Sequence, residues 1–256
     1  MKLENFLKIV KETKLQEIKY TRVKPDKAFS PKRKSLKNAI RTKEGVCIIA
    51  EIKKGSPSLG EIRKDLCVRS LAKDFEAAGV CGISVITDRT FFFSDFSFLD
   101  HLTDLSSPVL RKDFIIDPVQ IEETAMSCAS SLLLIVRFIE DKKRLKHLFS
   151  YSCSLGLEPV VEVFDDSDVK AAKEIGASLI MVNNRDLNTL KVNLSVSKRL
   201  IRYKKDREIW ISASGIENHE QIKELMDLGF DCFLIGTSIM KSSDPVRFIK
   251  ELKGEI

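Results

Sequence analysis

Three short segments place charged side chains at the ends of apolar runs or inside them. Glu51 and Lys53 close a run that starts at Val46, and they point to the same side of a strand because side chains alternate along it. Lys112 ends another run, and Glu162 lies inside a third. Buried charges are costly unless they are paired. A structural ion pair would satisfy this rule, but lysines and carboxylates in one enclosed site could also exchange protons with a substrate, which we favour for Glu51 and Lys53. Lys112, taken alone, would more simply be a lysine that reaches solvent.

Small residues follow two later apolar runs and are suited to holding an anion. Ser214 and Gly215 directly follow one run, and Gly236 and Thr237 follow the next. Backbone N–H groups in such turns, together with a helix N-terminus, bind phosphate groups. Either segment alone is also typical of an ordinary tight loop, so the prediction of a phosphate site rests on both together.

Other side chains near the ends of apolar runs could orient a substrate. Phe114 shares a side of its strand with Lys112 and could pack on an aromatic ring, although a core phenylalanine would give the same pattern. Asn183 can orient a carboxylate or a hydroxyl group. Arg185 could bind the substrate or tie its own loop together.

The elements that must position these residues alternate regularly along the chain. Short runs rich in Val, Ile, Leu and Phe alternate with amphipathic helical patterns, several of which end at a glycine. Continuous apolar runs of this length are typical of strands buried on both faces of a parallel sheet. The runs cover residues 46–52, 82–87, 108–112, 132–137, 159–163, 179–183, 208–213 and 231–235.

Uninterrupted alternation of strand and helix predicts an α/β fold, and the number of units favours a closed (β/α)8 TIM barrel. An open doubly wound sheet would need a glycine-rich nucleotide fingerprint, which GSPSLG does not match. We expect one domain over residues 1–256, with an N-terminal helical extension at 1–45 and the barrel at 46–256. The extension would be a lid or a plug across one barrel end. In such barrels the functional groups lie at the C-terminal ends of the strands.

Composition narrows the classes of partner. The net charge is +6, but the basic run near the N-terminus has few aromatic neighbours, so a solvated helix face is expected rather than nucleic-acid binding. That run contains Lys24, Lys27, Lys32, Arg33, Lys34 and Lys37. The six cysteines occur singly and are expected to act as small hydrophobes without a disulfide framework. The three histidines are far apart, so no metal site is expected.

The N-terminal segment has an amphipathic helix pattern that includes Leu3, Phe6 and Val10. It has no apolar run and cleavage site of the secretory kind, and no stretch of the sequence reaches transmembrane length. The expected location is therefore the cytoplasm, without membrane contact.

Together these segments resemble the indole-3-glycerol-phosphate synthase family. The likeness runs from about residue 46 to the C-terminus, and the N-terminal helical pattern also fits the family's extension. The most specific segments are IIAEIKKGSPSLGEI and PVLRKDFIIDPVQI. They are followed, in the family's order, by EPVVEVFD, VNNRDLNTLKVN, SASGI and LIGTSIMKSSDP.

The resemblance implies a decarboxylating lyase of tryptophan biosynthesis that needs no cofactor or metal. It would close the ring of 1-(2-carboxyphenylamino)-1-deoxyribulose 5-phosphate with loss of carbon dioxide and water. Lys112 would be the general acid and Glu162 the general base. Lys53 would bind the carboxylate or share the acid role, Glu51 would polarise the lysines, and Asn183 would position the substrate. The other implied substrate contacts are Ser56, Phe92, Phe114, Arg185, Ser214, Gly215, Gly236 and Thr237.

The implied partner is a small phosphorylated substrate. The chain is expected to be a monomer, and association with other tryptophan-pathway enzymes is left open. Two positions depart from the family pattern: Ala213 replaces a glutamate that lies among the catalytic charges, and Ser94 replaces the glycine of a Phe-x-Gly turn.

Two alternatives stay open. A phosphate-ligand-binding barrel with weakened catalysis would explain Ala213. A phosphoribosylanthranilate isomerase-like barrel would share the phosphate site, but it would use a Cys and Asp pair where this chain has Glu51 and Lys53.

Overall fold

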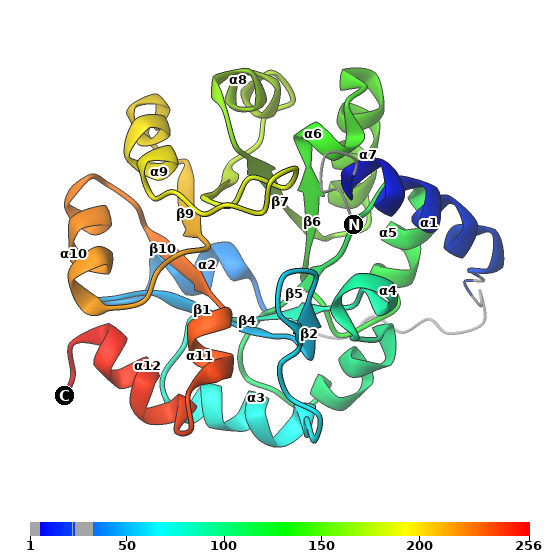
Figure 1. Cartoon of the computed structure of the whole chain (residues 1–256). Coiled ribbons are helices and arrows are strands. Elements are labelled where there is room, and N and C mark those ends of the chain that lie inside the picture. Colours follow the sequence, from blue (N-terminus) through cyan, green and yellow to red (C-terminus); the bar gives the residue numbers. More distant parts are fainter. Residues whose placement is uncertain (1–5, 22, 24–32) are drawn as a thin grey trace.

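The computed structural model describes residues 6–21, 23 and 33–256 and contains a closed barrel of parallel strands (Figure 1). Their order around the barrel is β1-β10-β9-β8-β7-β6-β5-β4. The prediction of a (β/α)8 barrel is confirmed. The barrel strands are β1 (Ile48–Ile52), β4 (Gly82–Ile86), β5 (Val109–Lys112), β6 (Ser131–Ile135), β7 (Glu158–Val163), β8 (Leu179–Asn183), β9 (Ile209–Ala213) and β10 (Cys232–Ile235).

Helices follow the strands and cover the outside of the barrel (Figure 1). Aspartate or asparagine side chains cap the N-termini of most of them, as at Asp117, Asp165 and Asn218. The helices are α3 (Val68–Ala77), α4 (Arg89–Phe92), η2 (Phe96–Leu102), α5 (Pro118–Ala125), α6 (Val136–Ile139), α7 (Lys142–Ser154), α8 (Asp166–Glu174), α9 (Ser195–Leu200), η3 (Ile201–Tyr203), α10 (His219–Asp227), α11 (Thr237–Lys241) and α12 (Pro245–Lys253).

Two local elements differ from the predicted pattern. Val136 and Arg137 begin the short helix α6 instead of ending a strand, because an apolar run alone does not distinguish a strand from a buried helix. The loop after β1 folds into a small antiparallel hairpin of β2 (Gly55–Ser56) and β3 (Gly60–Glu61). No helix in the described part of the chain is long and apolar enough to cross a membrane.

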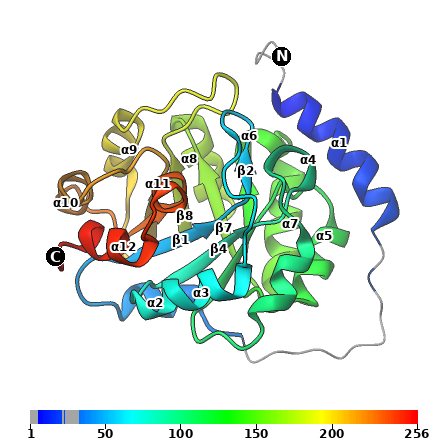
Figure 2. The ribbon, with the colours of Figure 1, turned by 60° about the horizontal axis from the view of Figure 1, so that its bottom comes forward.

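The N-terminal extension contains α1 (Phe6–Tyr20) and α2 (Leu36–Arg41), which lie near opposite ends of the barrel (Figure 2). Leu36 and Ile40 of α2 pack into the core inside the barrel. The Ser35 hydroxyl donates to Glu158, the first residue of β7, at 2.6 Å. Thus α2 closes the N-terminal end of the barrel, whereas α1 lies at the edge of the C-terminal end. The extension was expected to cover only one end.

The basic run is only partly within the described residues, because Lys24, Lys27 and Lys32 lie outside them. Leu3 of the predicted N-terminal helix pattern also lies outside them. The next two positions precede α2 and so are not on a helix face. Arg33 is only partly exposed and donates to the carbonyl oxygens of Leu155 (3.1 Å) and Ala125, whereas Lys34 is exposed, as expected, and donates to that of Leu105 (3.1 Å). These cations anchor the chain just before α2.

The expectation for the cysteines fails at one place. Cys47 and Cys81 pair as a disulfide with Cα atoms 5.7 Å apart, and the sulfur of Cys232 lies 3.4 Å from that of Cys47. The three residues lie at the starts of β1, β4 and β10, which are neighbours in the closed barrel. Barrel closure therefore gathers cysteines that are far apart in the sequence.

Candidate active site

The C-terminal ends of the strands surround a pocket with a volume of ≈ 370 Å³, a size that suits a small ligand. All but one of the predicted site residues line this main pocket. They are Glu51, Lys53, Ser56, Phe92, Lys112, Phe114, Asn183, Arg185, Ser214, Gly215, Gly236 and Thr237.

Glu162 lines a smaller pocket instead, together with Leu133 and Ile135, and we call this the aromatic pocket because Phe92 and Phe114 also line it. The two pockets adjoin each other, because Lys112, Asn183 and both phenylalanines line both of them.

Glu51, near the end of β1, forms ion pairs with two lysines. Its Oε1 atom lies 2.9 Å from Lys53 Nζ and its Oε2 atom 3.2 Å from Lys112 Nζ. Lys53 also donates to the Thr237 hydroxyl at 2.8 Å, which joins β1 to the start of α11. Glu51 and Lys53 are both buried, so these charges interact at close range with little screening by water.

Burial and pairing shift the pKa values of these groups in different directions. Burial raises the pKa of a carboxyl group, but Lys112 and Lys53 outweigh it and lower the pKa of Glu51 to about 2. Burial, partly offset by Glu51, lowers the pKa of Lys53. Burial acts on Lys112 in the same sense, but Glu51 and Glu162 outweigh it and raise its pKa. Burial therefore decides the direction of the shift at Lys53, and the two carboxylates decide it at Lys112.

Glu162 is a buried carboxyl group in the interior of the barrel. Burial raises its pKa, and the attraction of Lys112 and a hydrogen bond from Asn183 Nδ2 (3.1 Å) only partly offset this. A carboxylate with a raised pKa holds a proton more strongly than an exposed one, which suits a general base.

The small residues after β9 and β10 also line the main pocket, beside Glu51 and Lys53. We call them the cup and define it as Ser214, Gly215, Gly236 and Thr237. Ser214 and Gly215 both have a left-handed backbone, with φ of 71° and 81°. A Cβ atom on Gly236 would collide with the Glu51 carboxylate, so only glycine allows this close approach. Backbone N–H groups in such turns can hold an anion.

Phe114 and Arg185 each had two interpretations from the sequence. Phe114 lies beside Phe92 at the pocket, with the two ring centroids 6.3 Å apart. Arg185 lines the main pocket and also donates to the carbonyl oxygen of Leu190 at 2.7 Å, so it contacts the pocket and ties its own loop. At the departure from the glycine turn, Phe93 takes the left-handed conformation (φ 56°), and Ser94 is buried.

Ala213 ends β9, where it is buried and lines the main pocket. It is paired with Asn183 across the β8–β9 ladder. The carboxylate that the resemblance implies at this position would therefore face the site.

Sequence reasoning missed several residues around the site. Lys241 and Phe6 line the main pocket, and Asp88 and Asp113 line the aromatic pocket. Asp113 follows Lys112 directly, which could have drawn attention to it. Phe6 had no such signal, because its pattern marked only the apolar face of a helix. Within residues 6–21, 23 and 33–256, no three His, Cys, Asp or Glu side chains gather as a metal site would require.

Known proteins are similar to this chain in sequence and in fold. The family model described as indole-3-glycerol phosphate synthase matches residues 3–252. The indole-3-glycerol phosphate synthase of Aquifex aeolicus is 46% identical over 213 residues, which cover 82% of each chain. That of Thermoanaerobacter pseudethanolicus is 41% identical over 217 residues, 83% of each chain.

A solved structure of 3-hexulose-6-phosphate synthase from Salmonella typhimurium aligns with a TM-score of 0.63 at 13% identity, over 82% of this chain and 97% of that one. That likeness concerns the fold alone. The sequence matches extend over most of the chain at identities that define a family. The chain belongs to the indole-3-glycerol phosphate synthase family.

Proposed function

We propose that this chain closes the ring of 1-(2-carboxyphenylamino)-1-deoxyribulose 5-phosphate to give indole-3-glycerol phosphate, carbon dioxide and water. The observation that carries the proposal is that Lys112 and Asn183 line both the main pocket and the aromatic pocket. A substrate with a phosphate at one end and an aromatic ring at the other would thus span the cup and the aromatic pocket with its ketone between them.

In this proposal Lys112 protonates the ketone oxygen while the ring carbon that bears the carboxylate attacks the ketone carbon. A carbon–carbon bond forms, and loss of carbon dioxide restores the aromatic ring. Lys112 suits this step because it lies beside both Glu51 and Glu162 and its raised pKa keeps it charged when the substrate binds. In the dehydration, Lys53 donates a proton to the hydroxyl group, which leaves as water, while Glu162 accepts a proton from the neighbouring carbon of the new ring, so that a C=C bond forms.

Lys53 would bind the substrate carboxylate, and its lowered pKa makes it a second proton donor. The cup would hold the phosphate through backbone N–H groups, with Ser56 and Arg185 at its rim. Phe92 and Phe114 would cover the ring. Holding both ends of a flexible substrate removes much of the entropic cost of cyclisation.

The test is to follow indole fluorescence after the purified chain is mixed with this substrate. Lys112→Ala and Glu162→Gln should each lower kcat by about 10² to 10⁴-fold while calorimetry still detects substrate binding. Lys54→Ala is the matched control, because Lys54 pairs with Glu61 at 3.1 Å outside the pocket and should leave kcat unchanged. In the wild type, kcat should fall as the pH drops through the raised pKa of Glu162.

The second candidate function is a phosphate-ligand-binding barrel, which Ala213 favours because alanine occupies a buried pocket position where the resemblance implies a carboxylate. Tight substrate binding by the wild type with no product at any pH would establish that candidate and exclude the synthase. Formation of indole product that disappears in Lys112→Ala would exclude it in turn.

A further inference from the structure

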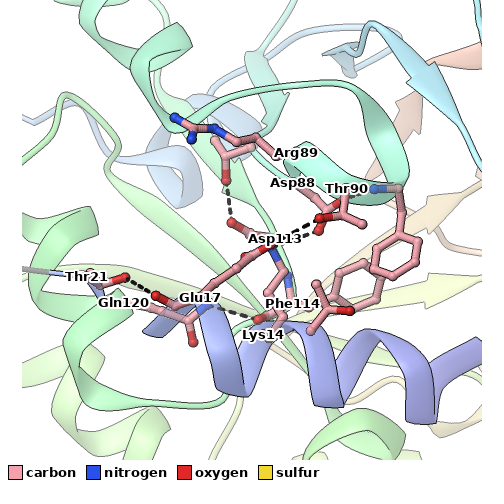
Figure 3. Close-up of polar contacts among 12 residues, drawn as sticks. Lys14, Glu17, Thr21, Asp88, Arg89, Thr90, Asp113, Phe114 and Gln120 are labelled. Carbon is pink, nitrogen blue, oxygen red and sulfur yellow. Dashed lines mark hydrogen bonds and ion pairs between the residues drawn. The ribbon is translucent and has the colours of Figure 1, made fainter. Parts of the chain in front are cut away.

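Helix α1 buries a lysine at the rim of the barrel (Figure 3). The side chain of Lys14 is only 3% exposed, and its Nζ atom lies 2.7 Å from Asp88 Oδ2 and 3.0 Å from Asp113 Oδ1. Glu17, one turn further along the helix, adds a third carboxylate at 2.8 Å. Asp88 and Asp113 are as fully buried as the lysine, so one cation holds together three segments of the chain.

Asp88 connects this cation to the loop after β4. Its Oδ1 atom caps α4 by accepting hydrogen bonds from the backbone N–H groups of Phe91 (2.6 Å) and Phe92 (3.2 Å). Phe92 lines both pockets. The position of this phenylalanine therefore depends on Asp88, and that of Asp88 depends on Lys14.

Asp113 connects the same cation to the end of β5. It stands between Lys112 and Phe114 in the chain, and its Oδ1 atom accepts a hydrogen bond from the Phe114 backbone N–H at 2.8 Å. Its other oxygen accepts from the Thr87 hydroxyl (2.6 Å) and from Arg111 (3.1 Å). Through Asp113, Lys14 supports the segment that carries the proposed general acid.

The same helix supplies part of the pocket wall. Phe6 lies two turns before Lys14, packs edge-on against Phe91 with ring centroids 5.3 Å apart, and lies 6.4 Å from Phe114. Phe6 also lines the main pocket, and both aspartates line the aromatic pocket. An ion pair that only fixed α1 to the barrel would not need to touch the walls of both pockets.

We infer that Lys14 is a positioning residue that sets the shape of the aromatic end of the site through Asp88, Asp113 and Phe6. The inference rests on the proposed function for its kinetic readout. Lys14 itself does not line either pocket, so it acts through its partners rather than on the substrate.

The test compares Lys14→Met, which keeps most of the length of the side chain and removes the charge, with Lys11→Met. Lys11 is on the same helix, but it pairs with Glu140 at the surface and is 37% exposed. Lys14→Met should lower kcat/KM by about 10²-fold, mainly by raising KM, because small misplacements of positioning groups are that costly. Lys11→Met should behave as the wild type.

A double variant separates positioning from simple charge compensation. In Lys14→Met/Asp88→Asn the uncompensated carboxylate is gone, and asparagine can still cap α4. This variant should recover folding stability but keep the high KM. Recovery of stability and KM together, or an unchanged KM in Lys14→Met, would overturn the inference.

Hydrogen exchange at the amides of Phe91 and Phe92 gives a readout that needs no turnover. Lys14→Met should exchange faster there than the wild type, and Lys11→Met should not. If the wild type forms no indole product, the proposed function fails by itself. Unchanged exchange at these two amides would then refute the positioning role independently.

Discussion

At the scale of single residues, the charge balance of the site depends on one carboxylate. Glu51 binds Lys53 and Lys112 at the same time, and its lowered pKa shows how strongly it is held in the charged form. The resemblance to the family implies a second carboxylate at the position of Ala213. At Lys53, burial outweighs the attraction of Glu51 and lowers the pKa.

Restoring that carboxylate gives the first residue-scale prediction. In Ala213→Glu the new side chain would enter the main pocket from the end of β9 and share the lysines with Glu51. We expect kcat to rise about tenfold, which corresponds to ~1.4 kcal/mol of barrier. Steady-state indole fluorescence measures it.

Ala213→Gln is the matched control, since it has nearly the same shape without the charge and should give no gain. A lower kcat in Ala213→Glu than in Ala213→Gln would mean that the pocket has adjusted to a single carboxylate, and the charge argument would be wrong.

At the scale of elements, the strands and their ends were predictable and the contacts of the extension were not. Continuous apolar runs located every barrel strand to within two residues, and alternation correctly put Glu51 and Lys53 on one side of β1. Lys14 carried no such signal, because α1 contains several lysines and only tertiary packing decides which one is buried. The β2–β3 hairpin was also missed, since its strands are too short to show a period.

The junction of β10 and α11 gives an element-scale prediction. Gly236 lies where the chain passes so close to Glu51 that an added methyl group must displace the carboxylate. Gly236→Ala should therefore weaken the contacts of Glu51 with both lysines and lower kcat/KM by at least about tenfold, or ~1.4 kcal/mol. Kinetics and a urea titration would be measured in parallel.

Gly176 is the contrasting control, because it follows α8, has φ of +81°, and has open space around its missing Cβ atom. Gly176→Ala should cost about 1–2 kcal/mol of stability through backbone strain and leave kcat/KM unchanged. Equal effects of the two variants on kcat/KM would show that Gly236 matters only for folding.

At the scale of the whole molecule, barrel closure brings together residues that the sequence separates widely. Lys53 and Thr237 are 184 positions apart, yet they share a hydrogen bond because β1 pairs with β10. The result is two buried charge clusters at one end of the barrel, one around Glu51 and one around Lys14. Both must be assembled from charges that water solvates in the unfolded chain, so folding and pH are linked.

Two buried carboxyl groups at this end of the barrel, Asp113 and Glu162, are predicted to affect stability with opposite signs. Burial opposes the charge of Asp113, but Lys14 and Arg111 outweigh it and lower its pKa below the ordinary 3.8. The ionised Asp113 carboxylate therefore stabilises the folded state above pH 3.8, and this stabilisation is lost as the pH falls toward the lowered pKa of Asp113. Glu162 has a pKa raised above the ordinary 4.5, mainly by burial, so its charged form destabilises the folded state above 4.5 and protonation relieves this.

Asp113→Asn and Glu162→Gln therefore give a paired prediction, measured as the free energy of unfolding from urea titrations between pH 7 and pH 3. At pH 7, Asp113→Asn should lose about 3–5 kcal/mol, because Lys14 and Arg111 are left as buried charges with one partner fewer. Glu162→Gln should gain on the order of 1 kcal/mol, since glutamine can still accept the hydrogen bond from Asn183 without the cost of a buried charge.

The changes in the free energy of unfolding caused by Asp113→Asn and by Glu162→Gln should also shrink over different pH ranges. The gain of Glu162→Gln should disappear as the pH falls from the raised pKa of Glu162 to 4.5, whereas the loss of Asp113→Asn should persist to 3.8 and shrink only below it. A stable but inactive Glu162→Gln would mean that the molecule keeps a destabilising charge because the reaction needs a base there. A Glu162→Gln that is less stable than the wild type at pH 7 would contradict this, and Glu162 would then be a structural partner of Lys112.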